Sequence, residues 1–302
     1  MKIGVDIGGQ HVAVGLVENE NLIVDKSELY SAEDREHIED AIVEKIVREI
    51  NEILEENNVS IDQIESIGIG SPGTISNGTI VKAGNLGLKD FNLLDRLKEH
   101  FDKPMHLRND GKCAALAEKA YGSLKDYDDA LFLNIGTGVG GAAFLGGKLL
   151  EPKRYSGFEF GHMVIEKDGI ECTCGKKGCF ERYASIKSLK NKVVSALNLE
   201  GDISGRYMRE NLLDMNNPEI NKIVNEFLDS IVLGINNLID IFEPEIICFG
   251  GSFSYYEGTE IFENYFKSKY YAEKGRFNEG EPPKLVMASF KNNAGIIGAT
   301  ID

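Results

Sequence analysis

The pattern of apolar and polar positions divides the chain into two halves that begin alike. Each half opens with short apolar stretches separated by a glycine turn, which is typical of strands joined by a tight hairpin. In the first half we expect these strands at residues 2–7, 12–18 and 21–30. In the second half we expect them at residues 130–135 and 139–146. Helical patterns follow in both halves, so the sequence predicts a duplicated α/β fold with a cleft between the copies.

Residues 33–57 show the clearest helical period, because isoleucines recur along one face while acidic residues fill the other. Asn109 is expected to begin an alanine-rich helix, and Pro244 to end a long helix over residues 218–242. A loop rich in glycine and asparagine is expected to follow Ser71 and to run through Asn85. The other helices are expected at residues 186–198, 203–213, 254–270 and 292–300. Further strands are expected at residues 64–71, 104–108, 246–249 and 284–288.

Composition and charge narrow the class of protein. The chain has 302 residues, a formal net charge of −16 and a hydrophobic fraction of 42%. The hydrophobic fraction is ordinary for a globular protein. The large negative charge, by contrast, predicts an acidic surface that repels nucleic acids and anionic membranes. No stretch approaches the roughly 20 apolar residues that cross a bilayer, and the first residues do not form an export signal. We therefore expect a cytoplasmic protein that binds neither nucleic acid nor membrane.

One short segment has the spacing of a metal site. His162 is followed by Cys172, Cys174 and Cys179, which together provide one imidazole and three thiolates. These four side chains make a complete tetrahedral set for a structural zinc ion, with no position left for a catalytic water. The chain has five cysteines, and an odd number with three close together fits a metal in a reducing compartment better than disulfides.

The glycine turns raise the question of phosphate binding. Gly136-x-Gly138-x-x-Gly141 and Gly68-x-Gly70-x-x-Gly73 both match the dinucleotide fingerprint, but that motif needs a helix directly after the turn. A strand pattern follows the first match, and Pro72 interrupts the second. The glycines therefore either make hairpins only or offer bare backbone N–H groups to phosphates. The presence of Gly8-Gly9, Gly136-Thr137-Gly138 and Gly250-Gly251 at matching places favours phosphate binding, with Asp6 beside a Mg²⁺–phosphate complex.

Three carboxylates are candidates for the chemistry. Asp110 follows Asn109 at the start of the alanine-rich helix, where this pair would serve as a helix cap in most proteins. The same position favours an ionised carboxylate that could take a proton from a hydroxyl attacking a phosphoryl group. Glu159 and Glu181 flank the Cys/His segment, either as solvated loop residues or as the wall of a pocket.

Together these motifs resemble the ROK family of sugar kinases and repressors, which has the duplicated actin-like ATPase (ribonuclease H-like) fold. The resemblance covers nearly the whole chain, with six motifs in the family's order. They are Asp6-Ile7-Gly8-Gly9, Asn109-Asp110, the stretch 135–141, the stretch 157–162 with 172–181, Gly250-Gly251, and the stretch 294–299. The resemblance implies a small N-terminal domain of residues 1–112 plus 292–302. It also implies a larger domain of residues 113–291 with a zinc-binding loop at 157–181.

The resemblance also implies a role for each site residue. Asp110 would be the general base on a sugar hydroxyl, the one on carbon six. One ring nitrogen of His162 would bind zinc and the other would donate a hydrogen bond to the sugar. The sugar would lie against Asn85, Asn109, Asp110, Glu159, His162 and Glu181. ATP with Mg²⁺ would lie against Asp6, Gly8, Gly9, Gln10, Gly136, Thr137, Gly138, Gly250 and Gly251. Sugar binding would close the two domains, and the family favours a homodimer.

Two departures from the family pattern bear on the substrate. Gln10-His11 stands where the family often has Thr-Lys, and Leu88 stands where glucose-specific members often carry an aromatic residue. His11 and Leu88 resemble the allose-kinase branch, so glucose, allose, mannose, N-acetylglucosamine and N-acetylmannosamine all stay open. The family's repressors carry a helix-turn-helix domain ahead of the first glycine motif, which here begins at Asp6. We therefore expect a kinase, not a regulator or a non-catalytic sugar sensor.

Overall fold

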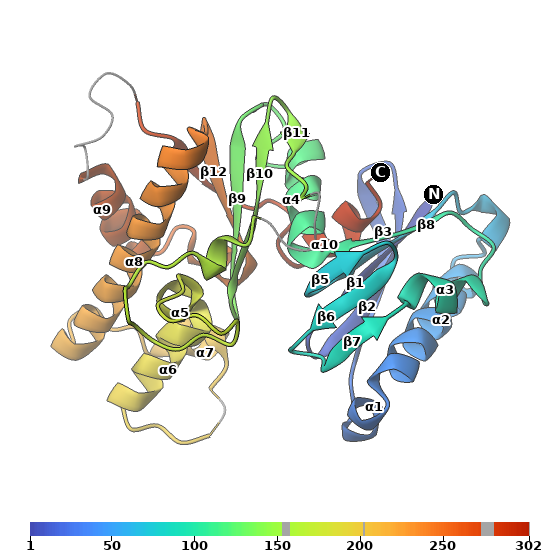
Figure 1. The fold of residues 1–302 in the computed structure, drawn as a ribbon, viewed down its shortest axis with the longest axis horizontal. Coiled ribbons are helices and arrows are strands. Elements are labelled where there is room, and N and C mark those ends of the chain that lie inside the picture. Colours follow the sequence, from blue (N-terminus) through green and yellow to red (C-terminus); the bar gives the residue numbers. More distant parts are fainter. Residues whose placement is uncertain (153–157, 202, 273–280, 302) are drawn as a thin grey trace. The chain divides into compact units, whose positions relative to one another are not determined.

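The computed structural model describes residues 1–152, 158–201, 203–272 and 281–301. It consists of two compact units (Figure 1). The first comprises Met1–Lys125, Glu151–Gly157 and Ser289–Asp302, and the second comprises Asp126–Leu150 and Phe158–Ala288. Residue 157, the expected start of the zinc-binding loop, and residue 302 lie outside the described residues. The domain boundaries expected at residues 112 and 292 stay a prediction.

The first unit is built on a five-stranded sheet of order β3-β2-β1-β4-β8. Neighbours β1–β2 and β2–β3 are antiparallel, whereas β1–β4 and β4–β8 are parallel. The strands are β1 (Lys2–Ile7), β2 (His11–Glu18), β3 (Asn21–Leu29), β4 (Ile67–Ser71) and β8 (Met105–Asn109). All five expected strands are therefore present, and a 3₁₀ turn at Ile61–Gln63 occupies the space before β4.

The two faces of this sheet carry different helices because side chains alternate along a strand. Ile3, Val5 and Ile7 of β1 point into a core with the isoleucines of α2 (Ile38–Glu56). Gly4 lies on the opposite face, where an added methyl group would overlap with the backbone of Ile296. Ile296 belongs to α10 (Ala294–Ala299), which packs on both the sheet and α4 (Asp110–Ala120). The glycines of this face let α10 lie directly on the strands.

The helix expected at 33–57 is interrupted. It consists of α1 (Ala32–Glu36), which begins with a capping box at Ser31, and α2, with the non-helical residue His37 between them. The loop expected through Asn85 is wrong, because it contains part of a small antiparallel sheet of order β5-β6-β7. These strands are β5 (Thr74–Ser76), β6 (Thr79–Ala83) and β7 (Leu88–Phe91), and α3 (Leu93–Lys98) follows. Asn77-Gly78 forms their first turn, and both residues have positive φ, so the turn signal in fact marks a hairpin.

The second unit repeats the arrangement of the first in a sheet of order β11-β10-β9-β12-β13. Its strands are β9 (Ala130–Ile135), β10 (Val139–Leu145), β11 (Lys148–Leu149), β12 (Ile246–Gly250) and β13 (Lys284–Met287). As in the first unit, the hairpin partners are antiparallel and β9, β12 and β13 run parallel. The common order and orientation confirm the duplicated α/β fold.

Helices bury one face of the second sheet. The long helix α8 (Pro218–Phe242) presents an apolar stripe to Leu131, Leu133 and Phe249. The expected α6 (Ile186–Ala196) and α7 (Gly205–Asn211) are present, and a short α5 (Glu181–Ala184) precedes them. The single helix expected at 254–270 is wrong. That region contains a 3₁₀ turn at Gly251–Tyr256, a π-helix at Ile261–Phe266 and α9 (Lys267–Ala272). Gly258, with a φ of +72°, interrupts the helical backbone between the first two of these elements.

The last expected helix is shorter than 292–300. A 3₁₀ turn at Lys291–Asn293 leads into α10, and the end of α10 is held by side chains of the sheet. Lys2 and Arg108 donate to the carbonyl oxygens of Thr300 and Ile301, and His106 contacts that of Ala299. Among the described residues, no helix is long and apolar enough to cross a membrane.

Candidate active site and metal centre

In the first unit, the predicted site residues gather at one edge of the sheet. Because β1, β4 and β8 are parallel, their carboxyl ends lie together at Gly8, Ser71 and Asn109. In open α/β sheets this is the edge at which ligands bind. Gly70 brings the strands close to α4, since a methyl group on it would lie 3.6 Å from the Cα atom of Asp110.

Asp6 and Asp110 form a carboxylate pair at this edge. Burial and, secondly, the charge of Asp110 raise the pKa of Asp6 from its ordinary value to about 7. Asp6 is covered by α10, because a methyl group on Gly295 would lie 2.6 Å from the carboxyl carbon of Asp6. A pair in which one carboxylate raises the pKa of the other is a typical surrounding for a divalent cation, whose charge would let both ionise.

The start of α4 fixes Asn109 and Asp110. The side-chain oxygen of Asn109 accepts a hydrogen bond from the backbone N–H of Lys112 (3.3 Å), so Asn109 is the helix cap. Its amide nitrogen donates to the carbonyl oxygen of Gly73 (3.1 Å). The Oδ1 atom of Asp110 accepts from the backbone N–H of Gly111 (2.8 Å), which holds the carboxylate at the positive end of the helix. Asn109 therefore caps α4, whether or not it also binds a ligand.

The first glycine turn joins β1 to β2. The backbone N–H of Gly8 donates to the carbonyl oxygen of His11, and a methyl group on Gly8 would lie 2.7 Å from the His11 ring. Burial lowers the pKa of His11. Asn85 lies beside the turn, because a methyl group on Gly9 would lie 3.1 Å from its amide nitrogen. Gln10 is exposed at the turn, while its carbonyl oxygen accepts from the N–H of Tyr30.

In the second unit, the two other glycine turns lie side by side. Gly250 of β12 pairs with Asn134 of β9, so the ends of these parallel strands are neighbours. Gly251 has a φ of +66°, and a methyl group there would overlap with the side chain of Asn134. Ser252 lies near Gly136, and the N–H of Gly136 donates to the carbonyl oxygen of Gly138 (2.9 Å) to close the turn. The turn between β9 and β10 thus presents Thr137 to solvent.

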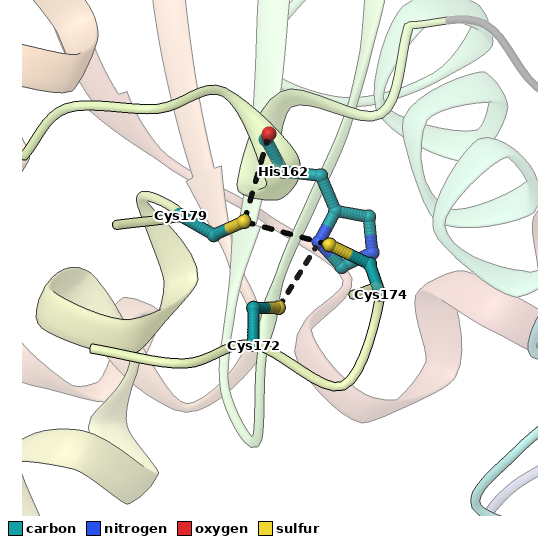
Figure 2. Close-up of side chains that lie close together, drawn as sticks. All are labelled: His162, Cys172, Cys174 and Cys179. Atoms are coloured by element: carbon teal, nitrogen blue, oxygen red, sulfur yellow. Dashed lines mark hydrogen bonds between the residues drawn. The ribbon is translucent and has the colours of Figure 1, made fainter. Parts of the chain in front are cut away.

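The Cys/His residues of the second unit converge as their spacing predicts (Figure 2). One ligand atom of each of His162, Cys172, Cys174 and Cys179 lies within 4.8 Å of the others. The sulfur atoms of Cys174 and Cys179 are 3.6 Å apart, and Cys172 Sγ is 3.6 Å from Nδ1 of His162. The latter distance identifies Nδ1 as the ring nitrogen that faces the cluster.

These distances fit zinc. Tetrahedral coordination with Zn–S bonds of about 2.3 Å and Zn–N bonds of about 2.05 Å places two sulfurs about 3.8 Å apart and a sulfur and a nitrogen about 3.6 Å apart. The four donors are soft and complete the shell, so they would hold zinc as a structural ion without an open position.

The loop around the cluster is shaped by its glycines and backbone hydrogen bonds. Gly175 and Gly178 both have positive φ, and a methyl group on Gly178 would overlap with the backbone of Glu166. The N–H of Cys172 donates to the carbonyl oxygen of Lys176 (2.8 Å), and Lys176 Nζ donates to the carbonyl oxygen of His162 (2.9 Å). The glycine turns and these hydrogen bonds therefore set the positions of the cysteines in the loop.

Glu159 and Glu181 take different positions beside the cluster. Glu181 begins α5, and its Oε1 atom lies 3.1 Å from Cys172 Sγ and 3.5 Å from Nδ1 of His162. Its other oxygen reaches the second glycine turn, because a methyl group on Gly138 would lie 2.7 Å from Oε2. Glu159 is exposed and precedes the 3₁₀ turn Phe160–His162. Glu181 thus connects the cluster to the glycine turn within the second unit.

The predicted site residues accordingly form two groups. The first unit holds Asp6, Gly8, Gly9, Gln10, Asn85, Asn109 and Asp110. The second unit holds Gly136, Thr137, Gly138, Glu159, His162, Cys172, Cys174, Cys179, Glu181, Gly250 and Gly251. Leu88, the position considered for sugar specificity, is buried in the hydrophobic core of the first unit.

Sequence reasoning did not single out Arg35 and Ser252. Arg35 of α1 donates to the carbonyl oxygen of Gly9 (3.0 Å) and lies over the ring of Tyr30, 5.6 Å from its centroid. Ser252 follows Gly251 next to Gly136. Neither has a local signal: Arg35 lies in an acidic helix segment, and the neighbourhood of Ser252 depends on the pairing of β9 with β12. Only the phosphate-motif resemblance of Gly250-Gly251 pointed towards this place.

Comparison with known proteins identifies the family of this chain. The family model described as "ROK family" matches residues 2–301, so the chain belongs to the ROK family. The glucokinase of Thermotoga maritima is 30% identical over 83% of this chain and 82% of its own length. The beta-glucoside kinase of Listeria innocua is 30% identical over 99% of this chain and 96% of its own length. Xylose repressors of Caldicellulosiruptor are also relatives, and this chain spans 57% and 66% of their lengths.

Solved structures give the same fold. A ROK family glucokinase from Streptomyces griseus, in complex with glucose and AMPPNP, superposes with a TM-score of 0.80 at 25% identity. The match covers 99% of this chain and 97% of that one. The chain therefore has the actin-like ATPase fold of the ROK sugar kinases, as its duplicated sheets indicate.

Proposed function

We propose that this protein is an ATP-dependent hexose kinase, glucokinase-like, that transfers the γ-phosphoryl group to a sugar hydroxyl, the one on carbon six. The carbohydrate-kinase class follows from ROK family membership and from the sugar kinases that match the chain over 82% and 96% of their own lengths. The observation that carries the proposal is the placement of Asp110 beside Asp6 at the ligand-binding edge of the first sheet, at the start of α4. A carboxylate in this position is suited to act as a general base.

Asp110 would accept the proton of the attacking hydroxyl. Its Oδ1 atom already accepts from Gly111, so the second carboxylate oxygen is the one suited to a substrate hydroxyl. Asn85 and Asn109 of the same unit would bind neighbouring hydroxyls, as would Glu159, Glu181 and Nε2 of His162. Nε2 suits this role because Nδ1 faces the cysteines.

The glycine turns would hold the nucleotide. Gly9 and Gln10 in one unit, and Thr137 and Gly138 in the other, would direct backbone N–H groups at the phosphates. Gly8 and Gly136, whose N–H groups close the turns, would let the phosphates approach the backbone. Gly250 and Gly251 would lie on the adenosine side. Mg²⁺ would neutralise the developing charge on the phosphates, and Asp6, with its raised pKa beside Asp110, is the residue suited to orient the cation's water shell.

The cysteine cluster would serve this site without taking part in the reaction. The four side chains would occupy all four coordination positions of zinc. The bound ion would thereby fix the orientation of His162 and the start of α5 at Glu181. A cytoplasmic location and a homodimer stay predictions from the sequence and its family resemblance.

Two other functions have support from the relatives. A kinase for a β-glucoside, allose or an N-acetylhexosamine would use the same general base, with other residues in contact with the sugar. A sugar-responsive regulator is favoured by the xylose repressors among the relatives. The presence of Asp110 in the expected place supports the kinase, because a regulator needs no proton acceptor there.

A coupled assay of ADP release over a panel of sugars tests the proposal. The panel should contain glucose, allose, mannose, N-acetylglucosamine, N-acetylmannosamine and a β-glucoside, each with Mg²⁺–ATP. We expect turnover with at least one hexose, and product analysis should place the phosphate on carbon six. Sugar binding without turnover for every member would overturn the kinase and favour the regulator.

A further inference from the structure

A buried carboxylate in α4 holds two of the segments that connect the units. The chain passes between the units four times, and two of these connections, after Lys125 and before Ser289, lie next to α4. Glu118 is fully buried (0% exposed), two turns after Asp110 on the same helix. Its Oε2 atom accepts from the backbone N–H of Ser123 (2.9 Å), and its Oε1 atom accepts from that of Phe290 (2.9 Å). One side chain thus ties the departing and the returning segments to α4.

Neighbouring contacts strengthen this connection. The hydroxyl oxygens of Ser123 and Ser289 are 2.9 Å apart, and the carbonyl oxygen of Glu118 accepts from the N–H groups of Gly122 and Leu124. A side chain at Gly122 would overlap with Oε2 of Glu118, so a larger residue there would displace the carboxylate. The carboxylate therefore sits in a space shaped for it between the two segments.

On the far side of each connection, the second unit holds the chain. Glu245 Oε2 accepts from the N–H groups of Asp128 (3.0 Å) and Asp129 (3.2 Å). The N–H of Ala288 donates to the carbonyl oxygen of Phe249 (2.9 Å). The stretch between the two anchored parts is short in both cases: residues 126–127 in the departing segment and Ser289 alone in the returning one.

We propose that Glu118 is a positioning residue that fixes two of the pivots of domain closure to the helix of Asp110. Closure around the sugar then turns about residues 126–127 and Ser289 and carries Asp110 as part of a rigid body. The inference rests on the proposed kinase function, because closure is what such an enzyme uses to exclude water. Hinges of this kind consist of a few residues that absorb the change in φ and ψ between well-anchored elements.

The test compares Glu118→Gln with the wild type and with Glu49→Gln. Glutamine keeps the shape of Glu118, but its amide nitrogen is a donor, so only one of the two backbone N–H groups keeps an acceptor. Glu49 is the matched control because it is a buried carboxylate (4% exposed) in α2 of the same unit, away from both connecting segments. Amide hydrogen exchange at single residues is measured with and without Mg²⁺–AMPPNP and the panel sugar of highest turnover.

In the wild type, we expect the ligands to change exchange at residues 126–127 and 289, while Ser123 and Phe290 stay protected. In Glu118→Gln, we expect exchange at Ser123 or Phe290 to rise about tenfold or more, which is the effect of one buried donor without a partner. We also expect kcat to fall about tenfold with the KM for sugar within about threefold, because positioning is lost and not binding. Glu49→Gln should change neither kcat nor exchange at these residues.

Three results would overturn the inference. One is a Glu118→Gln enzyme with wild-type kcat despite lost protection, which would make Glu118 a structural residue only. Another is ligand-dependent exchange that occurs elsewhere and not at the two pivots. This second measurement uses the wild type alone, so it decides the matter even if the variant does not fold. The third is unchanged protection of Ser123 and Phe290 in the variant. Failure of the wild type to phosphorylate any sugar sinks the kinase function instead, while these exchange data still decide what Glu118 anchors.

Discussion

Asp110 raises the pKa of Asp6. The two carboxylates belong to different elements: Asp6 lies on β1 and Asp110 on α4, which begins next to Gly70 of β4. Together with burial, the charge of Asp110 moves the pKa of Asp6 to about 7. Such repulsion on a buried carboxylate is costly for a fold, and functional sites are where it is commonly kept.

This pair predicts that stability falls as the pH rises towards neutrality. Because the folded state binds the Asp6 proton more tightly than the unfolded chain does, its contribution is fully present below about pH 4. The contribution is lost as the pH rises to about 7, where it levels off. A pKa difference of about three units corresponds to at most about 4 kcal/mol in the free energy of unfolding. Denaturant titrations at pH 4.5, 6 and 8 measure the change.

Glu49 contributes to the loss of stability over the same pH range, so its variant is compared with that of Asp6. Its pKa is raised to about 7, first by burial and then by the charge of Glu28, and its Oε2 atom has no hydrogen-bond partner among the described residues. Asp6→Asn and Glu49→Gln should each flatten part of the fall, and the double variant most of it. An equally steep fall in the double variant would show that neither group is responsible.

Asp110→Asn should remove turnover and spare sugar binding. The amide keeps the size of the side chain but cannot accept a proton, and general-base catalysis contributes about 10²–10⁴ in rate. We expect kcat to drop by that factor in the coupled assay, with sugar affinity by calorimetry unchanged within a few fold. Wild-type turnover in this variant would contradict the role of Asp110 as base.

The cysteine cluster should bind one zinc ion per chain in protein purified without added metal. Cys174→Ser should lose the ion and lower the melting temperature, because three remaining donors cannot complete the shell. Cys248→Ser is the matched control: Cys248 is a buried cysteine of β12 outside the cluster, and its variant should keep the zinc. Elemental analysis decides, and wild-type protein without metal would refute the site.

The packing of α10 makes a prediction about stability alone. A methyl group on Gly298 would overlap with the carbonyl oxygen of Cys113 in α4, where backbone cannot easily move. Gly298→Ala should therefore lower the free energy of unfolding by about 2–4 kcal/mol. Gly84→Ala is the control, because nothing lies within 4 Å of its added methyl group. Equal stability of the two variants would mean that α10 can shift without cost.

The sequence by itself determined the duplicated sheets, the metal cluster and the position of Asp110. These features depend on local patterns: alternating apolar residues, ligands close together in the chain, and a cap at a helix start. Where the signal was local but ambiguous, as at Asn77-Gly78, a hairpin was mistaken for a loop, and Gly258 broke a helix that periodicity alone had extended.

Only the tertiary structure decided which distant residues meet. Strand pairing brings Ser252 to Gly136, and α10, at the end of the chain, lies on the strands of its beginning through Gly4 and Gly68. It also places Glu118 between Ser123 and Phe290, although 172 residues separate Glu118 from Phe290. No local pattern records such contacts, because they form only when the sheets and helices close-pack and each buried polar group must find a partner.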